Sequence, residues 1–275
     1  MKKFFLYLGA LAIAGMLAFS CNKNGGEQGD DPEPDPEVKK EFYVSPEGSG
    51  LQDGSSAENA FSFKDLKDLL IFAPTIPEVE DTEPDVDPVV PEYDNVDAID
   101  GYTIIFADGT YKTPDDAEDV EGLTIAFPGY SKMVDLTFKG STGAALSGGE
   151  LGRVLTIGGQ VNLTIKGMTI RNGKLEEGNG GGISISSEEG EEAKLTLDGT
   201  VFANNKVSTS SSGGAIHCGK AVVSASECVF EADNYGRNGG SVYTNNSDAV
   251  VNCKNCTFKS HSLNTGGAAN NSKGE

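Results

Sequence analysis

The chain has 275 residues, of which 42 are Asp or Glu and 21 are Lys or Arg, so its formal net charge is −21 at pH 7. A protein this acidic does not bind nucleic acid or anionic lipid through its bulk charge, because both carry the same sign. The composition argues against a nucleic-acid partner and leaves cations or basic partner surfaces open.

The N-terminus has the pattern of an export signal. Two lysines precede an apolar run from Phe4 to Leu17, which is too short to span a membrane. The run ends at Ser20 and Cys21, and this ending resembles the lipobox of bacterial lipoproteins, in which the cysteine becomes the lipidated first residue. The resemblance implies a signal peptide over residues 1–20, lipidation of Cys21 and anchoring in the outer membrane. An ordinary cleaved signal with an incidental cysteine is the alternative.

Residues 21–41 are predicted to be a disordered acidic tether. They are rich in Gly, Asp, Glu and Pro and have almost no apolar residues, so they cannot bury enough surface to fold. In surface-exported lipoproteins of some Gram-negative bacteria, a short acidic stretch after the cysteine marks transport to the outside. Asp30 and Asp31 resemble that stretch, so we expect the protein to face the cell surface.

The folded part is predicted over residues 42–275. Residues 43–50 and 53–56 are similar to the opening of many secreted right-handed β-helix proteins, a group of pectate-lyase-like enzymes and non-enzymatic surface proteins. In that group a short helix caps the first coil, and residues 63–70 fit it, with apolar residues at positions 63, 66, 69 and 70. Residues 101–105 and 108–111 would then be the first strands. This opening argues for a fold and not for an activity.

An acidic insert over residues 74–100 is predicted to interrupt the folded part. It contains ten acidic residues and five prolines, with no Lys or Arg. Loops of this length are usually functional or disordered, and we expect disorder. A cation or partner site is the alternative, although the prolines and the lack of a calcium-loop pattern argue against one.

One eight-residue phrase occurs four times, at residues 163–170, 195–202, 223–230 and 251–258. Its last residue recurs at spacings of 32, 28 and 28, and a fixed period of this size indicates a repeat architecture. Places one, three, six and eight are mostly apolar or thiol, and place two is always small and polar. Alternation with period two predicts strands, and the break at places four and five predicts a bend between two of them.

A double glycine and another short strand follow each phrase, at Gly181-Gly182, Gly213-Gly214, Gly239-Gly240 and Gly266-Gly267. Each repeat is therefore one winding of chain, and equivalent strands lie parallel and about 4.8 Å apart. The handedness of parallel crossovers makes the winding right-handed. The predicted fold is all-β, a single-stranded right-handed parallel β-helix with a short N-terminal capping helix. Leu163, Leu195, Val223 and Val251 are expected to form one column in its interior.

Residues 202–205, followed by residues 213–216, resemble the paired Phe-x-x-Asn and Gly-Gly-Ala-Ile motifs of the polymorphic outer-membrane-protein repeats. Only this copy matches both motifs fully, since Phe230 is followed at the third place by Asp233 and Phe258 by His261. The resemblance covers roughly residues 150–271 and implies a surface protein.

No constellation of catalytic or metal-ligating residues is predicted, and no cofactor is expected. Cys228 and Cys256 share a rung, where a buried thiol ladder is favoured over a disulfide because stacked side chains point the same way. The two histidines, His217 and His261, are expected at the surface, without a serine or cysteine and a third orienting group. The side chains that a polysaccharide lyase would need, a basic residue beside converging carboxylates, are represented only by scattered residues: Lys139, Lys166, Arg171, Asp198 and Glu227.

The best candidate surface is the column of place-two residues, Thr164, Thr196, Ser224 and Asn252. Evenly spaced hydroxyls and an amide could hydrogen-bond an extended glycan, although Thr is also an ordinary strand residue. We therefore expect a surface lipoprotein that acts as an adhesive, display or glycan-binding module toward a polysaccharide or a host surface protein. A polysaccharide lyase or glycosidase is the alternative.

A third interpretation is a truncated relative with a structural role. The sequence ends at Glu275 without a capping helix or a polar terminal strand, and a repeat stack needs a cap at its open end. We expect either a shortened member of the family or a last coil that pairs with something else.

Overall fold

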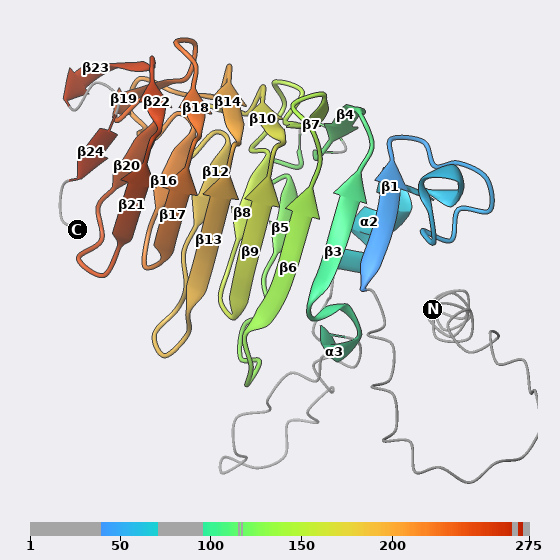
Figure 1. The fold of residues 1–275 in the computed structure, drawn as a ribbon. Coiled ribbons are helices and arrows are strands. Elements are labelled where there is room, and N and C mark those ends of the chain that lie inside the picture. The colour runs from blue at the N-terminus through green and yellow to red at the C-terminus, as the bar shows by residue number, and fades with distance from the viewer. Residues whose placement is uncertain (1–39, 71–95, 115, 117, 266–268, 272–275) are drawn as a thin grey trace, which may run out of the picture.

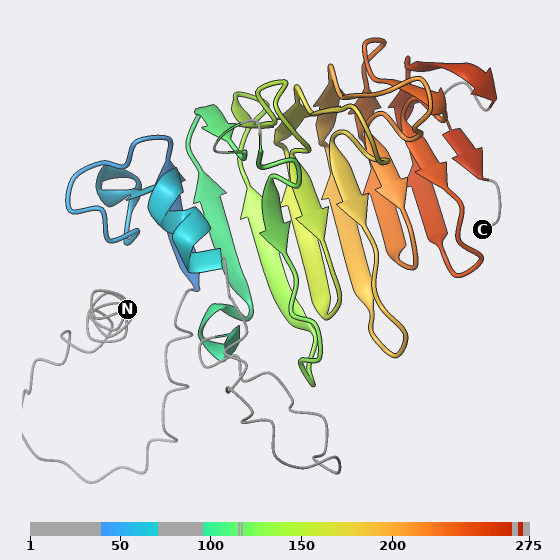
Figure 2. The ribbon, with the colours of Figure 1, turned by 180° about the vertical axis from the view of Figure 1, so that it is seen from behind.

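The computed structural model describes residues 40–70, 96–114, 116, 118–265 and 269–271. Its named strands form four sheets, and every pair of neighbouring strands is parallel. Strands from successive windings lie side by side along the axis (Figure 1), and Figure 2 shows the same stack from behind. The predicted right-handed parallel β-helix is confirmed. The predicted signal peptide, Cys21 and the tether up to residue 39 lie outside the described residues.

Each sheet collects one strand from each winding, in an order that follows the axis. The eight-stranded sheet runs in the order β2 (Phe61–Ser62), β1 (Glu41–Ser45), β3 (Tyr102–Phe106), β6 (Val134–Lys139), β9 (Val161–Lys166), β13 (Ala193–Asp198), β17 (Val222–Ser226) and β21 (Val250–Lys254). One six-stranded sheet contains β22 (Thr257–Phe258), β18 (Val229–Phe230), β14 (Val201–Ala203), β10 (Thr169–Arg171), β7 (Ala144–Ser147) and β4 (Gly109–Lys112).

The two remaining sheets close the coil. The second six-stranded sheet contains β24 (Ala269–Asn271), β20 (Val242–Thr244), β16 (Ile216–Cys218), β12 (Ile183–Ile185), β8 (Leu155–Ile157) and β5 (Leu123–Ile125). The four-stranded sheet contains β11 (Lys174–Leu175), β15 (Lys206–Val207), β19 (Tyr235–Asn238) and β23 (His261–Thr265).

The repeated phrase stacks in the register that its alignment predicts. Leu163 pairs with Leu195, Leu195 with Val223, and Val223 with Val251. The first three are at most 1% exposed, and Val251 packs against the core at the edge strand β21. The interior column that defines the fold is therefore present.

The bend inside the phrase depends on one left-handed residue per winding. Place five holds Gly167, Gly199, Glu227 and Asn255, and their φ angles are 69°, 59°, 54° and 56°. The two glycines differ in surroundings, because a Cβ on Gly167 would lie 2.5 Å from the carbonyl oxygen of Gly140, whereas a Cβ on Gly199 meets nothing within 4 Å. A left-handed residue turns the chain sharply, which is why the inward-facing parity changes here.

The β-helix begins earlier in the chain than the four phrases indicate. Leu136 pairs with Leu163 and Leu146 with Ile170, so β6 and β7 form another copy of the same winding. Leu146 lies ten positions after Leu136, whereas Ile170 lies seven positions after Leu163. The longer corner hides this copy from an alignment of the phrase.

Aromatic rings and amides stack through the interior. The ring centroids of Phe202 and Phe230 are 4.8 Å apart, as are those of Phe230 and Phe258, with interplanar angles of 6° and 4°. At the next corner the buried Asn205 and Asn234 form a second ladder, in which Asn205 Nδ2 donates to Asn234 Oδ1 at 3.0 Å. Each amide also donates to a carbonyl of the preceding winding. The Asn of the Phe-x-x-Asn motif is thus a structural residue that satisfies backbone groups at a buried corner.

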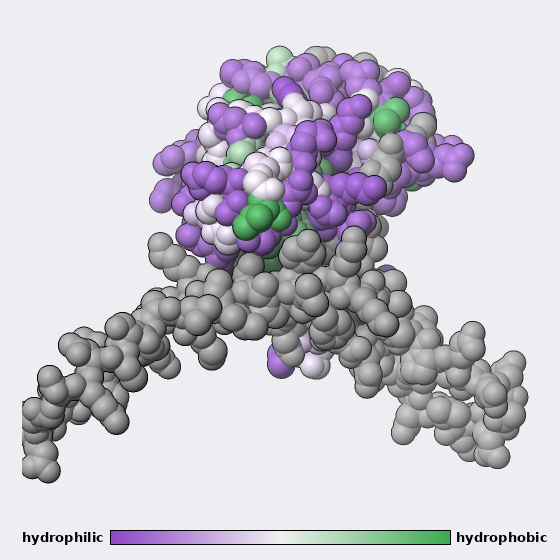
Figure 3. Space-filling model, turned by 90° about the vertical axis from the view of Figure 1, so that its right-hand side faces the viewer, coloured by the Kyte–Doolittle hydropathy of each residue, from purple (hydrophilic) through white to green (hydrophobic). Residues whose placement is uncertain are grey.

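The N-terminal end is capped as predicted. The helix α2 (Phe63–Leu70) covers the first coil, with Phe63 and Leu66 buried, and the 3₁₀ turn η1 (Ala57–Asn59) precedes it. A short helix, α3 (Val96–Ile99), lies within the last residues of the predicted insert and buries Val96, so this part of the insert is helical; residues 71–95 lie outside the described part. The strand β1 pairs with β3 in the same sheet, so the prediction that residues 101–105 hold the first strand of the coil is wrong. Figure 3 views this end along the axis and shows a mostly hydrophilic surface with isolated hydrophobic residues. None of the helices in the described ranges has the length and apolar character needed to cross a membrane.

Candidate functional site

The predicted polar column lies on the outer face of the eight-stranded sheet. Thr164 pairs with Thr196, Thr196 with Ser224, and Ser224 with Asn252. The residues on either side of the first three are buried, whereas Asn252 lies on the edge strand between the partly buried Val251 and the exposed Cys253. Thr196 and Asn252 are exposed, and Thr164 and Ser224 are partly exposed. The alternation of the strands therefore presents all four side chains to solvent on one face, as the sequence predicts; a ligand for them stays a prediction.

The column is longer than the four repeated phrases predict. Thr137 pairs with Thr164, and Thr103 pairs with Thr137, so hydroxyls continue onto β6 and β3. Both belong to windings whose corners differ in length from those of the four phrases. The Leu-Thr dipeptide at 136–137, identical to the one at 163–164, is the signal that could have found them.

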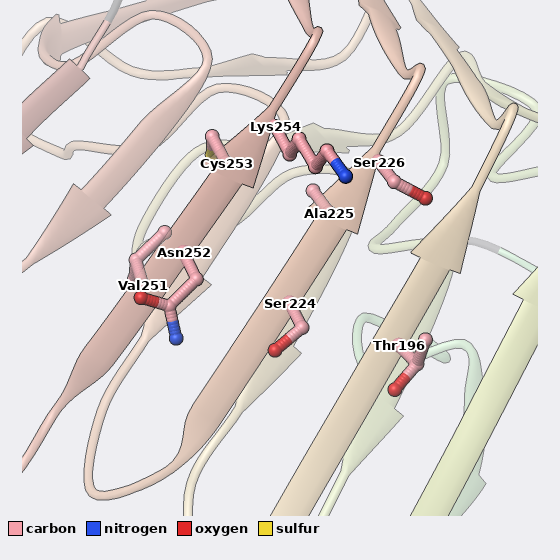
Figure 4. Close-up of a pocket in the computed structure, with 8 residues that line it drawn as sticks. All are labelled: Thr196, Ser224, Ala225, Ser226, Val251, Asn252, Cys253 and Lys254. Carbon is pink, nitrogen blue, oxygen red and sulfur yellow. The ribbon is translucent and has the colours of Figure 1, made fainter.

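A shallow hollow of about 380 Å³ lies at the C-terminal end of this column. Its lining comes from β13, β17 and β21 and consists of Thr196, Ser224, Ala225, Ser226, Val251, Asn252, Cys253 and Lys254. Figure 4 shows Thr196, Ser224 and Asn252 on neighbouring strands of the same face, with Ser226 and Lys254 further along their strands. Three of the four predicted residues thus line one concave surface.

A second outward column runs beside the first and carries lysines. It contains Lys139, Lys166, Asp198, Ser226 and Lys254, in register on successive strands. All three lysines are exposed. Lys139 and Lys166 are direct neighbours, an arrangement that costs free energy because like charges face each other across strands. Within the described part of the chain, no ion pair joins any of the three to a carboxylate.

The outer face is therefore more positive than the molecule as a whole. On the five strands from β6 to β21, the outward charged residues are four lysines and two aspartates, namely Lys139, Lys166, Lys194, Lys254, Asp135 and Asp198. Lys194 pairs with Glu192 at 2.6 Å, at the start of its strand. In a chain of net charge −21, this face is a local region of positive sign.

Of the other residues that a lyase would use, Asp198 lies beside Lys166 in the second outward column, whereas Arg171 and Glu227 lie outside it. Arg171 lies on a different sheet from Lys166 and donates from Nη2 to Thr110 Oγ1 at 2.7 Å. Asp198 accepts from Ser226 Oγ at 3.1 Å, and Glu227 occupies the left-handed bend. Among the residues the structure describes, no group of three or more His, Cys, Asp or Glu could hold a metal ion.

The thiols differ in exposure along the stack. Cys218 and Cys228 are buried, and burial raises the pKa of each thiol to about 12. Cys256 occupies the rung below Cys228 and is partly exposed. Cys253 pairs with Ala225 but is exposed, because β21 is the edge strand. Partial desolvation of its thiol, together with the neighbouring Cys256, raises its pKa to about 11. All four are free thiols.

The expectation for His217 is wrong in one respect. His217 points outward from β16, as expected, but a serine and a third polar group accompany it. Ser184 Oγ lies 3.4 Å from His217 Nδ1, and Asn245 Oδ1 lies 3.3 Å from His217 Nε2. These partners are 33 and 28 residues away in sequence, and only the stacking of windings brings them to the imidazole. The side chain of His261 lies outside the described residues.

Comparisons with family models, with curated proteins and with solved structures found no match for this chain. The likeness to polymorphic outer-membrane-protein repeats and to secreted β-helix proteins therefore rests on the sequence motifs, while the structure establishes the parallel β-helix itself.

Proposed function

We propose that this chain is a surface-displayed binding module, anchored in the outer membrane through a lipid on Cys21, whose β-helix binds an extended polysaccharide. The proposal depends on one observation, which is the unbroken outward column of hydroxyl and amide side chains from Thr103 to Asn252. The rigid stack behind the column holds these groups in fixed positions. Preorganised groups lose little conformational freedom when a ligand binds.

The spacing of the column suits a polymer better than a small molecule. Neighbouring strands are about 4.8 Å apart, which is close to the length of one pyranose ring along an extended chain. Each sugar unit could therefore meet one Thr, Ser or Asn and exchange hydrogen bonds with it. The shallow hollow at Ser224 and Asn252 adds contact surface at the C-terminal end of the column.

The neighbouring lysines favour an acidic polysaccharide. Lys139, Lys166 and Lys254 are exposed and have no carboxylate partner in the described ranges. Carboxylate or sulfate groups on a bound glycan would supply the missing counter-charge and relieve the repulsion between Lys139 and Lys166. A ligand of this kind also explains why a strongly acidic protein keeps a positive face.

Binding can be measured with the full chain on immobilised polygalacturonate, alginate and heparin, with neutral dextran as the comparison. We expect binding to the acidic polymers that weakens with salt, because exposed charges are screened. Lys166→Gln should weaken it about 3- to 10-fold, and Thr196→Val about 2- to 10-fold, since each removes roughly one contact. Lys64→Gln, on the distant helix α2, removes the same charge and serves as the control.

Two outcomes would contradict the proposal. One is binding that Lys64→Gln weakens as much as Lys166→Gln, which would show attraction by overall charge. The other is an absence of binding to every polymer tested. Surface display is tested separately: proteinase added to intact cells should digest the protein, and Cys21→Ala should release it from the membrane fraction.

A further inference from the structure

A row of polar side chains lies on the outer face of the six-stranded sheet that contains β12, β16 and β20. Ser184 pairs with His217, and His217 pairs with Tyr243, so the three occupy successive windings. Their neighbours Ile183, Ile216 and Val242 are buried, which orients the row toward solvent. This row faces a different side of the helix from the polysaccharide surface proposed above.

The hydrogen bonds around His217 define its tautomer. Asn245 Oδ1 accepts from Nε2–H at 3.3 Å, since a carboxamide oxygen cannot donate. The other ring nitrogen, Nδ1, is then unprotonated and accepts from the hydroxyl of Ser184 at 3.4 Å. A serine hydroxyl aimed at the lone pair of a histidine, itself held by a third group, is the arrangement that activates a nucleophile.

The surroundings keep this histidine neutral and in place. Burial lowers the pKa of His217 below its usual range, the Asn245 hydrogen bond opposes that shift, and the positive Arg153 adds to it. Tyr243 stacks on the imidazole with ring centroids 5.9 Å apart. The backbone at Gly180 also approaches closely, because a Cβ there would lie 2.9 Å from the Cβ of His217. The base is therefore unprotonated near neutral pH and its ring has little freedom to turn.

A cationic donor lies one winding away. The Arg153 side chain is 8% exposed and ion-paired to Glu121, and its Nη1 also donates to Thr156 Oγ1 at 3.1 Å. Thr156 occupies the position next to Ser184 in the same row. The guanidinium is thus held one winding from Ser184, and the Glu121 carboxylate, which accepts from Thr156 Oγ1 at 3.0 Å, balances its charge there.

We propose that Ser184, His217 and Asn245 form an acyl-transfer site that acts on carboxylic esters. The Ser184 oxygen attacks the ester carbonyl carbon, and the hydroxyl proton passes to Nδ1 of His217. The bond from carbon to the leaving alcohol breaks, and His217 returns the proton to that alcohol. Water then attacks the acyl-serine in the same way, which releases the carboxylic acid and restores the hydroxyl. Ser184 and His217 are the catalytic residues, and Asn245 is the positioning residue.

The first test uses the full chain with a fluorophosphonate probe and mass spectrometry. The Ser184 oxygen should displace fluoride from phosphorus, which leaves a stable adduct on the peptide that contains residue 184. Ser184→Ala should abolish the adduct, and His217→Gln should reduce its rate at least tenfold because the base is gone. Ser210→Ala, a change of an exposed serine that lies in a turn outside the row and contacts Ser208 Oγ at 3.0 Å, is the control and should leave labelling unchanged.

The second test follows hydrolysis of p-nitrophenyl acetate as a function of pH. The rate should rise with pH and reach its plateau near neutrality, because only unprotonated His217 accepts the proton. Asn245→Ala should lower the rate and change the midpoint of this profile, which a purely structural role would not do; circular dichroism checks that each variant is folded. The proposal is overturned if Ser184 carries no adduct, or if folded His217→Gln labels and hydrolyses as fast as the unmodified protein.

Discussion

The buried amide ladder gives the sharpest test of what holds the coil together. Asn205→Ala would remove three hydrogen bonds: from Nδ2 to Ile170 O at 2.9 Å, from Nδ2 to Asn234 Oδ1 at 3.0 Å, and from Gly173 N–H to Oδ1 at 3.1 Å. Each is worth about 1 kcal/mol net, and each lost partner leaves a buried group that costs about 1–3 kcal/mol. We expect the free energy of unfolding to fall by about 3–6 kcal/mol.

Urea denaturation followed by circular dichroism measures this change, with Asn252→Ala as the matched control. Asn252 is exposed on the outer face, so its truncation should change the free energy of unfolding by less than about 0.5 kcal/mol. Asn205→Asp sharpens the experiment, because it preserves the shape and the acceptor but loses both donated bonds, and it should destabilise at neutral pH. If Asn205→Ala falls within 1 kcal/mol of Asn252→Ala, the structural role of the Phe-x-x-Asn asparagine is refuted.

Three further predictions follow from individual residues. Gly199→Ala should lower the free energy of unfolding by about 1 kcal/mol through its left-handed φ alone, and Gly167→Ala by about 2–3 kcal/mol, because its Cβ also meets a carbonyl oxygen of the preceding winding; equal losses in urea melts would contradict this. His217 has a folded-state pKa below its unfolded value, so it contributes stability above pH 6.5 that is lost as pH falls through the folded pKa. His217→Gln should remove that part of the pH dependence in thermal melts, and an unchanged pH profile would count against it. Cys253 should react with a maleimide before Cys218, slowly at pH 7 because its pKa is about 11, and mass spectrometry of the alkylated peptides checks the order.

The sequence predicts the interior of this protein better than its surface chemistry. The repeated phrase defines the strands, the inward column and the bend, because each depends on a local pattern with a fixed period. Where corner length varies, the same pattern fails. Phe202 is followed after three residues by Asn205, but Phe230 is followed after four by its structural equivalent, Asn234, so the motif comparison selects Asp233 instead. Asp233 is not in the buried ladder, and its Oδ1 accepts from the exposed backbone N–H of Asn204 at 2.8 Å.

The double glycines show the same effect on a smaller scale. Ile183 pairs with Ile216, so the glycine pair in register with Gly213-Gly214 is Gly180-Gly181, and Gly182 takes the place of Ala215. The run of three glycines at 180–182 leaves the register undetermined until the strands that follow are aligned. Gly180 and Gly213 have φ angles of 75° and 69°. The strand register places these two left-handed glycines in one column.

The polar contacts of His217 escape prediction for a different physical reason. Like residues recur at the apolar positions and in the place-two column, whereas unlike residues meet on the outer face of β12, β16 and β20, so no repeated residue type marks their contact. Ser184, His217 and Tyr243 each follow the branched residue after a double glycine, so the register that aligns Ile183, Ile216 and Val242 also aligns them. In a parallel β-helix, any two residues one period apart are neighbours, whatever their chemistry.

This separation between interior and exterior makes stability and activity independently testable. The amide and aromatic ladders lie inside the coil, whereas Thr196, Lys166 and Ser184 lie on outer faces whose backbone bonds are already made by the sheets. Substitutions at these outer positions should therefore leave the free energy of unfolding nearly unchanged while they alter binding or acyl transfer. The two outer faces belong to different sheets, so Lys166→Gln should not affect hydrolysis and Ser184→Ala should not affect polysaccharide binding. If one variant lost both activities without unfolding, the two surfaces would have to be parts of a single site.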